Sequence, residues 1–316
     1  MPELAQLERD LGALEKDQSL YDGDNLAGRF LALKRLDFLA EAYRLRAGEQ
    51  PASDQEQRVR VMQADLARRN QALYQELRAR ISAGAVTPHQ LRTLFEDNGN
   101  YRPGDKACLH WRGEAADALA AGLFRSDSPP QRWNGGDSEM IHYEPAPVGA
   151  LLELVDRVPM TSADRFVDIG SGLGQVVLLV HLLTGVEAVG LEVMPAFVEQ
   201  AEQEAAALGV NGVTFEHGDA RNADLCKGTV YFLFSPFRGQ MLQKVLKRLR
   251  NEAKARQLTI CSFGPCTVTF AAENWLTIEE PEMDNEFRLA IFHSRGDKTK
   301  RQPSTREPAR ANACRC

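Results

Sequence analysis

Residues 166–180 read FVDIGSGLGQVVLLV. An apolar run that includes Asp168 is followed by three glycines at alternating positions, Gly170, Gly172 and Gly174, and then by a second apolar run. Glycine permits tight turns and lets a ligand approach the backbone closely. A strand followed by a glycine-rich turn that opens a helix is typical of nucleotide-binding α/β proteins.

The sequence after this turn alternates short apolar runs with helical patterns. The runs EAVGLEV, VTFEHGD and GTVYFLF have strand character, and amphipathic stretches such as MPAFVEQAEQEAAALG separate them. This alternation predicts a parallel, doubly wound sheet. Only PEMDN separates the last two strand-like runs, NWLTIEE and EFRLAIFHS, so these should form an antiparallel pair. We therefore expect a Rossmann-like α/β fold, a seven-stranded sheet whose last strand is antiparallel.

The region before the sheet is dominated by helical periods. Residues 26–46 are almost all helix formers, and apolar residues recur at helical spacing over 57–82. Thr87 and Pro88 fit the N-cap and the first position of another helix. No strand-like alternation interrupts the region. We expect an all-helical N-terminal domain over 1–123, a linker or lid over 124–142, the α/β domain over 143–294, and a disordered basic tail over 295–316.

Composition excludes several broad classes of protein. The chain has 316 residues, and its net charge of -6 provides no global basic field for nucleic acid or anionic membrane. The start, MPELAQLERD, is charged rather than apolar, and no run approaches the roughly 18 apolar residues of a membrane span. The six cysteines form no CxxC pair. They are expected to be reduced thiols of a cytoplasmic protein.

Two basic segments could contact acidic partners. The tail after residue 294 is rich in Lys and Arg and has no apolar periodicity, which favours disorder. The helix predicted over 57–82 has an excess of arginines over acids, and we prefer a solvated helix face to an RNA-binding surface because aromatic residues do not interleave with them. Those arginines are Arg58, Arg60, Arg68, Arg69, Arg78 and Arg80.

The spacing and charge of the glycine turn favour S-adenosylmethionine over a dinucleotide. Dinucleotide-binding turns follow G-x-G-x-x-G and face a pyrophosphate, whereas this turn has Gln175 where the third glycine should stand. The carboxylate of Asp168 would repel a pyrophosphate. S-adenosylmethionine carries an ammonium and a sulphonium and no phosphate, so the same carboxylate becomes a charge-assisted partner, direct or through water. A NAD(P)-dependent oxidoreductase stays open as the less favoured alternative.

Two further acids follow later strands of the predicted sheet. Glu192 ends the second strand, where such folds position an acid that accepts from ribose hydroxyls. Asp219, beside Ala220, follows the third strand, where an acid can accept from the adenine amino group. Either acid alone is explained equally well as a solvated strand-end residue or a helix cap. In order with Asp168, at the carboxyl ends of successive strands, they predict one cofactor cleft at the switch point of the sheet.

These features resemble the class I S-adenosylmethionine-dependent methyltransferases over about residues 143–294. Within that class, FVDIGSGLGQVVL and the preceding HYEPAPVGALLELVDRV are most similar to the non-SET histone-lysine methyltransferases of the disruptor-of-telomeric-silencing type and their bacterial look-alikes, which share a D-x-G-S-G-x-G-Q loop. The resemblance implies that Tyr143 and Glu144 close over the methionine end of the cofactor and that Ser171 and Gln175 line the loop. Packing of Tyr143 at a domain junction explains that residue equally well.

The expected fourth strand ends in FLFSPFRG, where the match to that family weakens. Ser235, Pro236 and Phe237 fit the turn that carries N/D-P-P-F/Y in nitrogen-methylating class I enzymes, and with Tyr143 they are the candidate catalytic residues. Phe234 stands where an Asn or Asp would hold the amine, and Ser235 can accept only one hydrogen bond in its place. Methylation of lysine or of a base is therefore implied by the resemblance alone.

A methyltransferase with this site would work by in-line displacement at the sulphonium methyl. Because the positive charge already activates the methyl group, the protein mainly aligns the nucleophile and excludes water. The acceptor, a protein lysine or another nucleophile, is not determined by the sequence, and no general base is assigned. A non-catalytic cofactor-binding or scaffold protein stays open because of Phe234.

Overall fold

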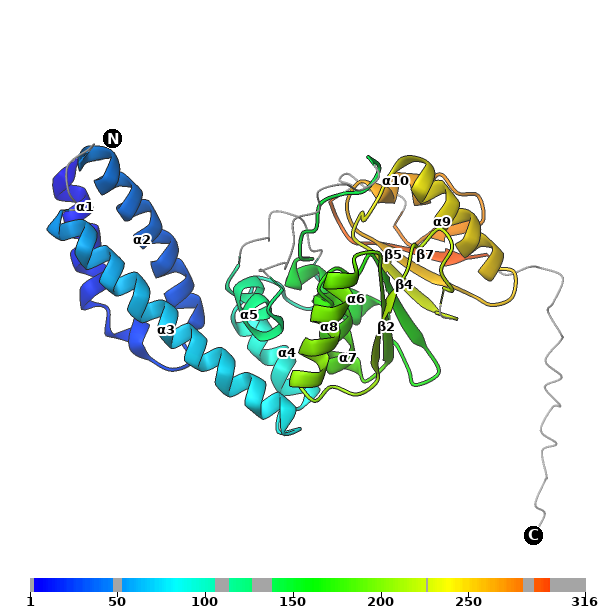
Figure 1. The fold of residues 1–316 in the computed structure, drawn as a ribbon, viewed down its shortest axis with the longest axis horizontal. Coiled ribbons are helices and arrows are strands. Elements are labelled where there is room, and N and C mark those ends of the chain that lie inside the picture. The colour runs from blue at the N-terminus through cyan, green and yellow to red at the C-terminus, as the bar shows by residue number, and fades with distance from the viewer. Residues whose placement is uncertain are drawn as a thin grey trace, which may run out of the picture.

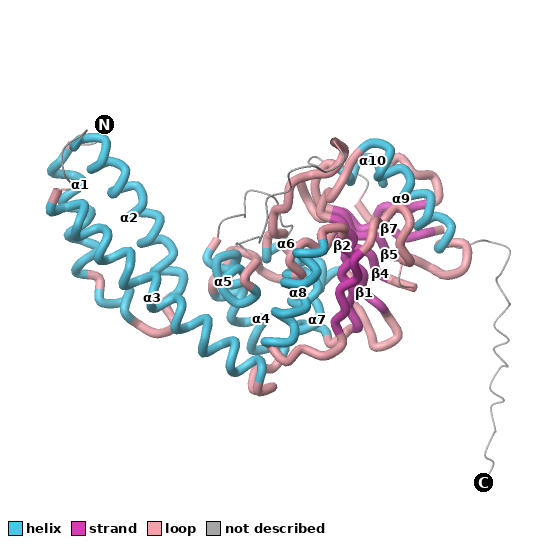
Figure 2. Tube along the Cα trace, viewed as in Figure 1, coloured by secondary structure: helices cyan, strands magenta, loops and turns pink. Residues whose placement is uncertain are grey.

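The computed structural model describes residues 3–47, 53–105, 114–126, 138–225, 227–280 and 287–295. Within these ranges a helical N-terminal region precedes a sheet that helices cover on both faces (Figure 1, Figure 2). Most of the predicted linker over 124–142 and of the predicted tail over 295–316 lies outside the described residues. The division of the chain at those positions stays a prediction.

Every element described ahead of the sheet is helical, as predicted. Local hydrogen bonds fix where two of the helices begin: Thr87 caps one with Pro88 in its first turn, and Ser53 caps another in a capping box with Glu56. The elements are α1 (Leu4–Lys16), the 3-10 helix η1 (Gln18–Tyr21), α2 (Leu26–Ala47), α3 (Asp54–Ser82), α4 (Pro88–Asp97) and α5 (Ala115–Phe124).

The sheet has seven strands in the order β3-β2-β1-β4-β5-β7-β6. β7 lies between β5 and β6 and is antiparallel to both, whereas the other neighbouring strands are parallel. The prediction of a doubly wound sheet with an antiparallel last strand is confirmed. The strands are β1 (Arg165–Ile169), β2 (Glu187–Glu192), β3 (Val213–His217), β4 (Val230–Leu233), β5 (Thr259–Ser262), β6 (Leu276–Ile278) and β7 (Ala290–Ser294).

Helices cover both faces of this sheet. They are α6 (Val148–Arg157), α7 (Gln175–Thr184), α8 (Pro195–Ala207), α9 (Gly239–Glu252) and the short α10 (Cys266–Ala271), which was not expected from the sequence. Side chains alternate along β1, so Phe166 faces the layer of α6, α7 and α8, and Val167 and Ile169 face the layer of α9 and α10. Asp168 lies two residues after Phe166, so its side chain points to the same face of the sheet. Its carboxylate therefore lies in an apolar layer near the carboxyl end of the strand.

The helix α3 joins two hydrophobic cores. In its first half, Val59 and Leu66 pack with α1 and α2 in a core of their own. In its second half, Tyr74 and Ile81 belong to the core shared by α4 to α8. The helical region is thus divided by packing. α1, η1, the first half of α3 and α2 beyond Leu26 form a projecting unit, here called the arm, while Leu26, α4 and α5 pack with the α/β domain (Figure 1).

None of the described helices combines the length and the apolarity that crossing a membrane requires.

A buried ion pair fastens the second half of α3 to α8. Arg78 Nη1 lies 2.8 Å from Glu204 Oε2, and the two side chains are 12% and 7% exposed. Arg78 Nη1 also donates to the carbonyl of Leu123. Glu204 Oε2 has no hydrogen bond of suitable angle within the described ranges, so its contact with Arg78 is electrostatic. Arg125 approaches the other carboxylate oxygen at 3.4 Å.

Replacing Arg78 by Met should lower the free energy of unfolding by about 3 kcal/mol, because it leaves the buried Glu204 carboxylate without its main counter-charge. Arg80→Met is the matched control: Arg80 is 45% exposed and 3.9 Å from Glu76, so its loss should cost less than about 0.5 kcal/mol. Urea denaturation of the two variants measures the difference. Equal destabilisation by both changes would contradict a structural role for the buried pair.

Candidate functional site

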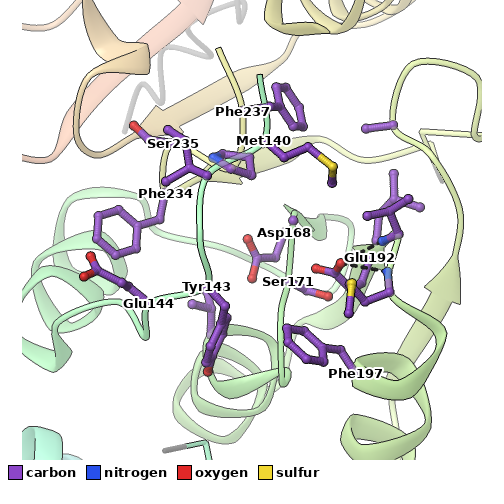
Figure 3. A pocket seen from close by; sticks show the side chains of 18 of the residues that line it. Met140, Tyr143, Glu144, Asp168, Ser171, Glu192, Phe197, Phe234, Ser235 and Phe237 are labelled. Atoms are coloured by element: carbon purple, nitrogen blue, oxygen red, sulfur yellow. Dashed lines mark hydrogen bonds between the residues drawn. The ribbon is translucent and has the colours of Figure 1, made fainter. Parts of the chain in front are cut away.

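A cavity of about 510 Å³ lies at the carboxyl ends of β1, β2 and β4 (Figure 3). This volume is in the range of sites that bind small molecules. The segment 139–146, here called the lid segment, contributes one wall, and the glycine turn, the end of β2 and the turns after β3 and β4 contribute the others. Five separate parts of the chain therefore meet at one edge of the sheet, as the predicted switch point requires.

All of the predicted site residues except Gly172 and Gly174 line this cavity. They are Tyr143, Glu144, Asp168, Gly170, Ser171, Gln175, Glu192, Asp219, Ala220, Ser235, Pro236 and Phe237. The fold thus brings the predicted set together, and the role of each residue stays a prediction.

Backbone donors hold the carboxylate of Glu192 in one orientation. Its Oε2 accepts from Gly172 N at 2.9 Å, and its Oε1 accepts from Val193 N at 2.8 Å and from Met194 N at 2.9 Å. Burial raises the pKa of Glu192, and these three N–H donors act in the opposite direction by favouring the charged form. Oε1 already accepts two hydrogen bonds and Oε2 accepts one, so Oε2 keeps one acceptor site that can be directed to a ligand in the cavity.

Asp168 lies in the middle of the cavity wall with its carboxylate unpartnered. It is 2% exposed, and no hydrogen bond to it exists among the described residues. Burial raises the pKa of this carboxyl well above its usual range, and the negative charge of Glu192 raises it further. A buried acid beside a second acid is stabilised by a cation, so this wall favours a positively charged ligand.

The third predicted acid, Asp219, is held by its neighbour Arg221. Asp219 Oδ1 accepts from Arg221 N at 2.8 Å, and the guanidinium lies 2.7 Å from Oδ2. This pairing with Arg221 lowers the pKa of Asp219, so the group is charged. No group of three or more His, Cys, Asp and Glu side chains within the described ranges could hold a metal ion.

Two glycines of the turn approach protein side chains rather than the cavity. A Cβ atom at Gly172, whose φ is +53°, would lie 2.2 Å from the ring of Tyr143, and one at Gly174 would lie 2.6 Å from the ring of Phe215. At these two positions the bare backbone makes room for Tyr143 and Phe215, and the contact with a ligand stays a prediction. Their missing side chains let the lid segment and β3 pack onto the turn.

Gln175 ties the lid segment to the glycine turn. Its Nε2 donates to Ala146 O at 3.0 Å, and its Oε1 accepts from Ser126 Oγ at 2.5 Å. Tyr143 Oη donates to Ser126 O at 3.0 Å, and the Tyr143 ring meets the ring of Phe197 edge to face with centroids 5.5 Å apart. The side-chain amide is thus used to position the wall of the cavity, and Tyr143 is fixed on two sides.

Sequence reasoning missed Glu139, which anchors the other end of the lid segment. Its Oε1 accepts from Gln240 N and its Oε2 from Met241 N, both at 2.8 Å, so the carboxylate caps the start of α9. Nearby, Ile141 N donates to Pro236 O at 3.1 Å. The partners of Glu139 are about a hundred positions away in the sequence, and no local pattern could have indicated the contact.

The turn after β4 uses its serine internally. Ser235 has a positive φ of 42°. Its Oγ donates to Phe263 O and accepts from Cys266 N, both at 3.0 Å, which leaves it one lone pair. Phe234 packs edge to face on Phe263 with centroids 5.3 Å apart, and it lines the cavity, as Glu144 does (Figure 3). The wall that would receive an acceptor is therefore aromatic.

Replacing Asp168 by Asn should stabilise the ligand-free protein at high pH. A carboxyl with a raised pKa contributes stability below its unfolded-state pKa of about 4, and this contribution is lost as pH rises through the folded-state pKa. We therefore expect the variant to melt several degrees above the natural protein at pH 8 and to differ less at pH 5. Asp97→Asn, at an exposed carboxyl of α4, should change neither value. A loss of stability at pH 8 in the Asp168 variant would refute this assignment of a buried charge.

Residues 142–215 match the family model described as histone methylation protein DOT1. Among solved structures, an RNA methyltransferase from Salinibacter ruber is 21% identical, with 50% of this chain and 98% of that chain covered and a TM-score of 0.40. The ribosomal protein L11 methylase from Lactobacillus delbrueckii is 16% identical, with coverages of 48% and 78% and a TM-score of 0.38. An S-adenosylmethionine-dependent methyltransferase from Geobacter sulfurreducens is 24% identical, with coverages of 35% and 47% and a TM-score of 0.30.

No curated protein matches the chain. The strand order of the sheet and the match over residues 142–215 agree with the expectation from the glycine turn. The α/β part of this chain has a Rossmann-like fold, and residues 142–215 of it are similar to the family described as histone methylation protein DOT1.

Proposed function

We propose that this protein binds S-adenosylmethionine in the cavity at the carboxyl edge of the sheet and transfers its methyl group to an amine. The observation that carries the proposal is Asp168, a buried carboxylate without a partner within the described ranges, in a cavity that Glu192 also lines. The ammonium of the cofactor would neutralise Asp168. Its ribose hydroxyls would donate to Glu192, and its adenine would lie by Asp219 and Ala220.

The same residues disfavour a dinucleotide. A pyrophosphate at the glycine turn would bring negative charge to Asp168 and Glu192, two acids that burial already penalises. The side chain of Gln175, at the position of the third glycine in dinucleotide-binding turns, is committed to Ala146 and Ser126. A cofactor that carries positive charge and no phosphate fits this electrostatic environment better.

When bound, S-adenosylmethionine supplies a methyl group on a positively charged sulphur. The residues of the chain then orient the two reactants and exclude water. Tyr143, which is fixed between Gly172, Phe197 and Ser126, would confine the methionine end. The lone pair of the acceptor nitrogen forms the new bond to carbon while the carbon–sulphur bond pair returns to sulphur.

An amine acceptor is supported by the wall around Phe234. An ammonium approaching along the ring would gain a cation–π contact, and Glu144 lines the same cavity. Transfer needs the neutral amine, and Glu144 would accept its proton. A lysine side chain, with its apolar stem and cationic tip, matches this combination.

Binding of S-adenosylhomocysteine by calorimetry tests the cofactor site. Glu192→Gln should weaken binding by tenfold or more, because the change removes charge-assisted acceptors at the ribose. Glu187→Gln, at the exposed opposite end of β2, is the matched control and should bind like the natural protein. Binding of NAD without binding of S-adenosylhomocysteine would refute the proposed cofactor.

Transfer of labelled methyl groups to lysine-containing peptides tests the acceptor side. Phe234→Ala should lower kcat by about tenfold, the loss expected for a misplaced acceptor, with little change in the affinity for S-adenosylhomocysteine. A protein that binds S-adenosylhomocysteine but methylates no amine would favour a non-catalytic binding protein, an alternative suggested by the aromatic Phe234 and the internally bonded Ser235.

A further inference from the structure

The helix α2 of the arm presents an apolar stripe to solvent. Leu31, Phe38 and Leu45 are 66%, 43% and 61% exposed and lie seven residues apart. The opposite face of α2 is buried against the rest of the arm through residues such as Leu36 and Leu39. Seven residues make almost two helical turns, so the three exposed side chains form one line about 21 Å long.

This stripe differs from the isolated apolar side chains that are common on protein surfaces. The described residues include seven exposed large hydrophobic side chains, and three of them belong to this one stripe. A repeat of seven is the spacing at which one helix packs along another, with apolar side chains meeting at each repeat. The arm stands clear of the sheet along most of α2 (Figure 1), so a partner helix could lie along the stripe.

We propose that the partner is α2 of a second copy of this chain, in antiparallel orientation, with a two-fold axis near Phe38. Leu31 and Leu45 are equidistant from Phe38 in the sequence. An antiparallel pair therefore places Leu31 against Leu45 of the partner at both ends and Phe38 against its own copy at the centre. A two-fold interface needs a surface that is complementary to itself, and this stripe meets that condition.

The charges beside the stripe follow the same symmetry. Lys34 lies four residues before Phe38, and Glu41 lies three residues after it on the same side of the helix. Glu41 pairs with Arg44 of its own helix at 2.7 Å. Antiparallel pairing brings each Lys34 to the Glu41 of the other copy, so that each Glu41 carboxylate would lie between Arg44 and the partner's Lys34. A parallel pairing in register would instead bring Lys34 to Lys34, so the charges select the antiparallel arrangement.

The C-terminal tail is a poorer occupant for this surface. Its sequence after residue 295, GDKTKRQPSTREPARANACRC, contains no large aliphatic or aromatic side chain to cover Leu31, Phe38 and Leu45. Its positive charges would meet Lys34, Arg35, Arg44 and Arg46 on the exposed side of α2.

Sedimentation of the full chain over a concentration series tests the proposal. The stripe is short compared with a standard interface of about 800 Å² per partner, so we expect a weak dimer that forms as concentration rises to the order of 1 mM. Phe38→Asp should weaken dimerisation at least tenfold, because it places two buried carboxylates at the centre. Val61→Asp, at an apolar residue of α3 that is 60% exposed and outside the stripe, should leave it unchanged.

Exchanging the charges of Lys34 and Glu41 distinguishes the antiparallel pairing of α2 from other dimer arrangements. Lys34→Glu and Glu41→Lys should each weaken the dimer, because each makes both flanking pairs repulsive, and the double change should restore it. A chain that stays monomeric at all concentrations, or a dimer that Phe38→Asp leaves intact, would overturn the proposal. So would single variants that the double change does not rescue. Far-UV circular dichroism of each variant checks that the arm stays folded.

Discussion

The site depends on two buried carboxylates, Asp168 and Glu192, whose negative charges repel each other. They end neighbouring parallel strands, so the sheet itself brings them to one edge, and both lie out of water. Three backbone N–H groups hold Glu192, whereas Asp168 has no partner within the described ranges. In the ligand-free protein these buried negative charges are unfavourable, and a cationic ligand would neutralise them. Such uncompensated charges are typical of binding sites and not of ordinary hydrophobic cores.

Burial of these acids depends on a wall that comes from elsewhere in the chain. The lid segment is fixed at one end by Glu139 on the start of α9 and at the other by Gln175 on the carbonyl of Ala146. Between these anchors Tyr143 packs on Gly172. The glycine turn, the lid segment and the turn after β4 therefore form one unit, and a change in any of them would alter the surroundings of Asp168.

The helical region serves two different cores. Its second part, with α4 and α5, packs with the α/β domain, and the buried pair of Arg78 and Glu204 joins it to α8. Phe197, on the same helix α8, contacts Tyr143 of the lid segment. The arm has a core of its own and projects from this assembly, which leaves the exposed stripe of α2 available for another chain.

The sequence predicts the alternation of strands and helices, the antiparallel last strand and twelve of the residues that line the cavity. These follow from local patterns: apolar runs, the spacing of the glycines, and acids at strand ends. It did not reveal Glu139, the contact of Gly172 with Tyr143, the internal hydrogen bonds of Ser235, or the two hydrophobic cores that α3 joins. These features depend on contacts between residues that are far apart in the sequence. Such contacts form only in the folded chain, and no periodic pattern along the sequence predicts them.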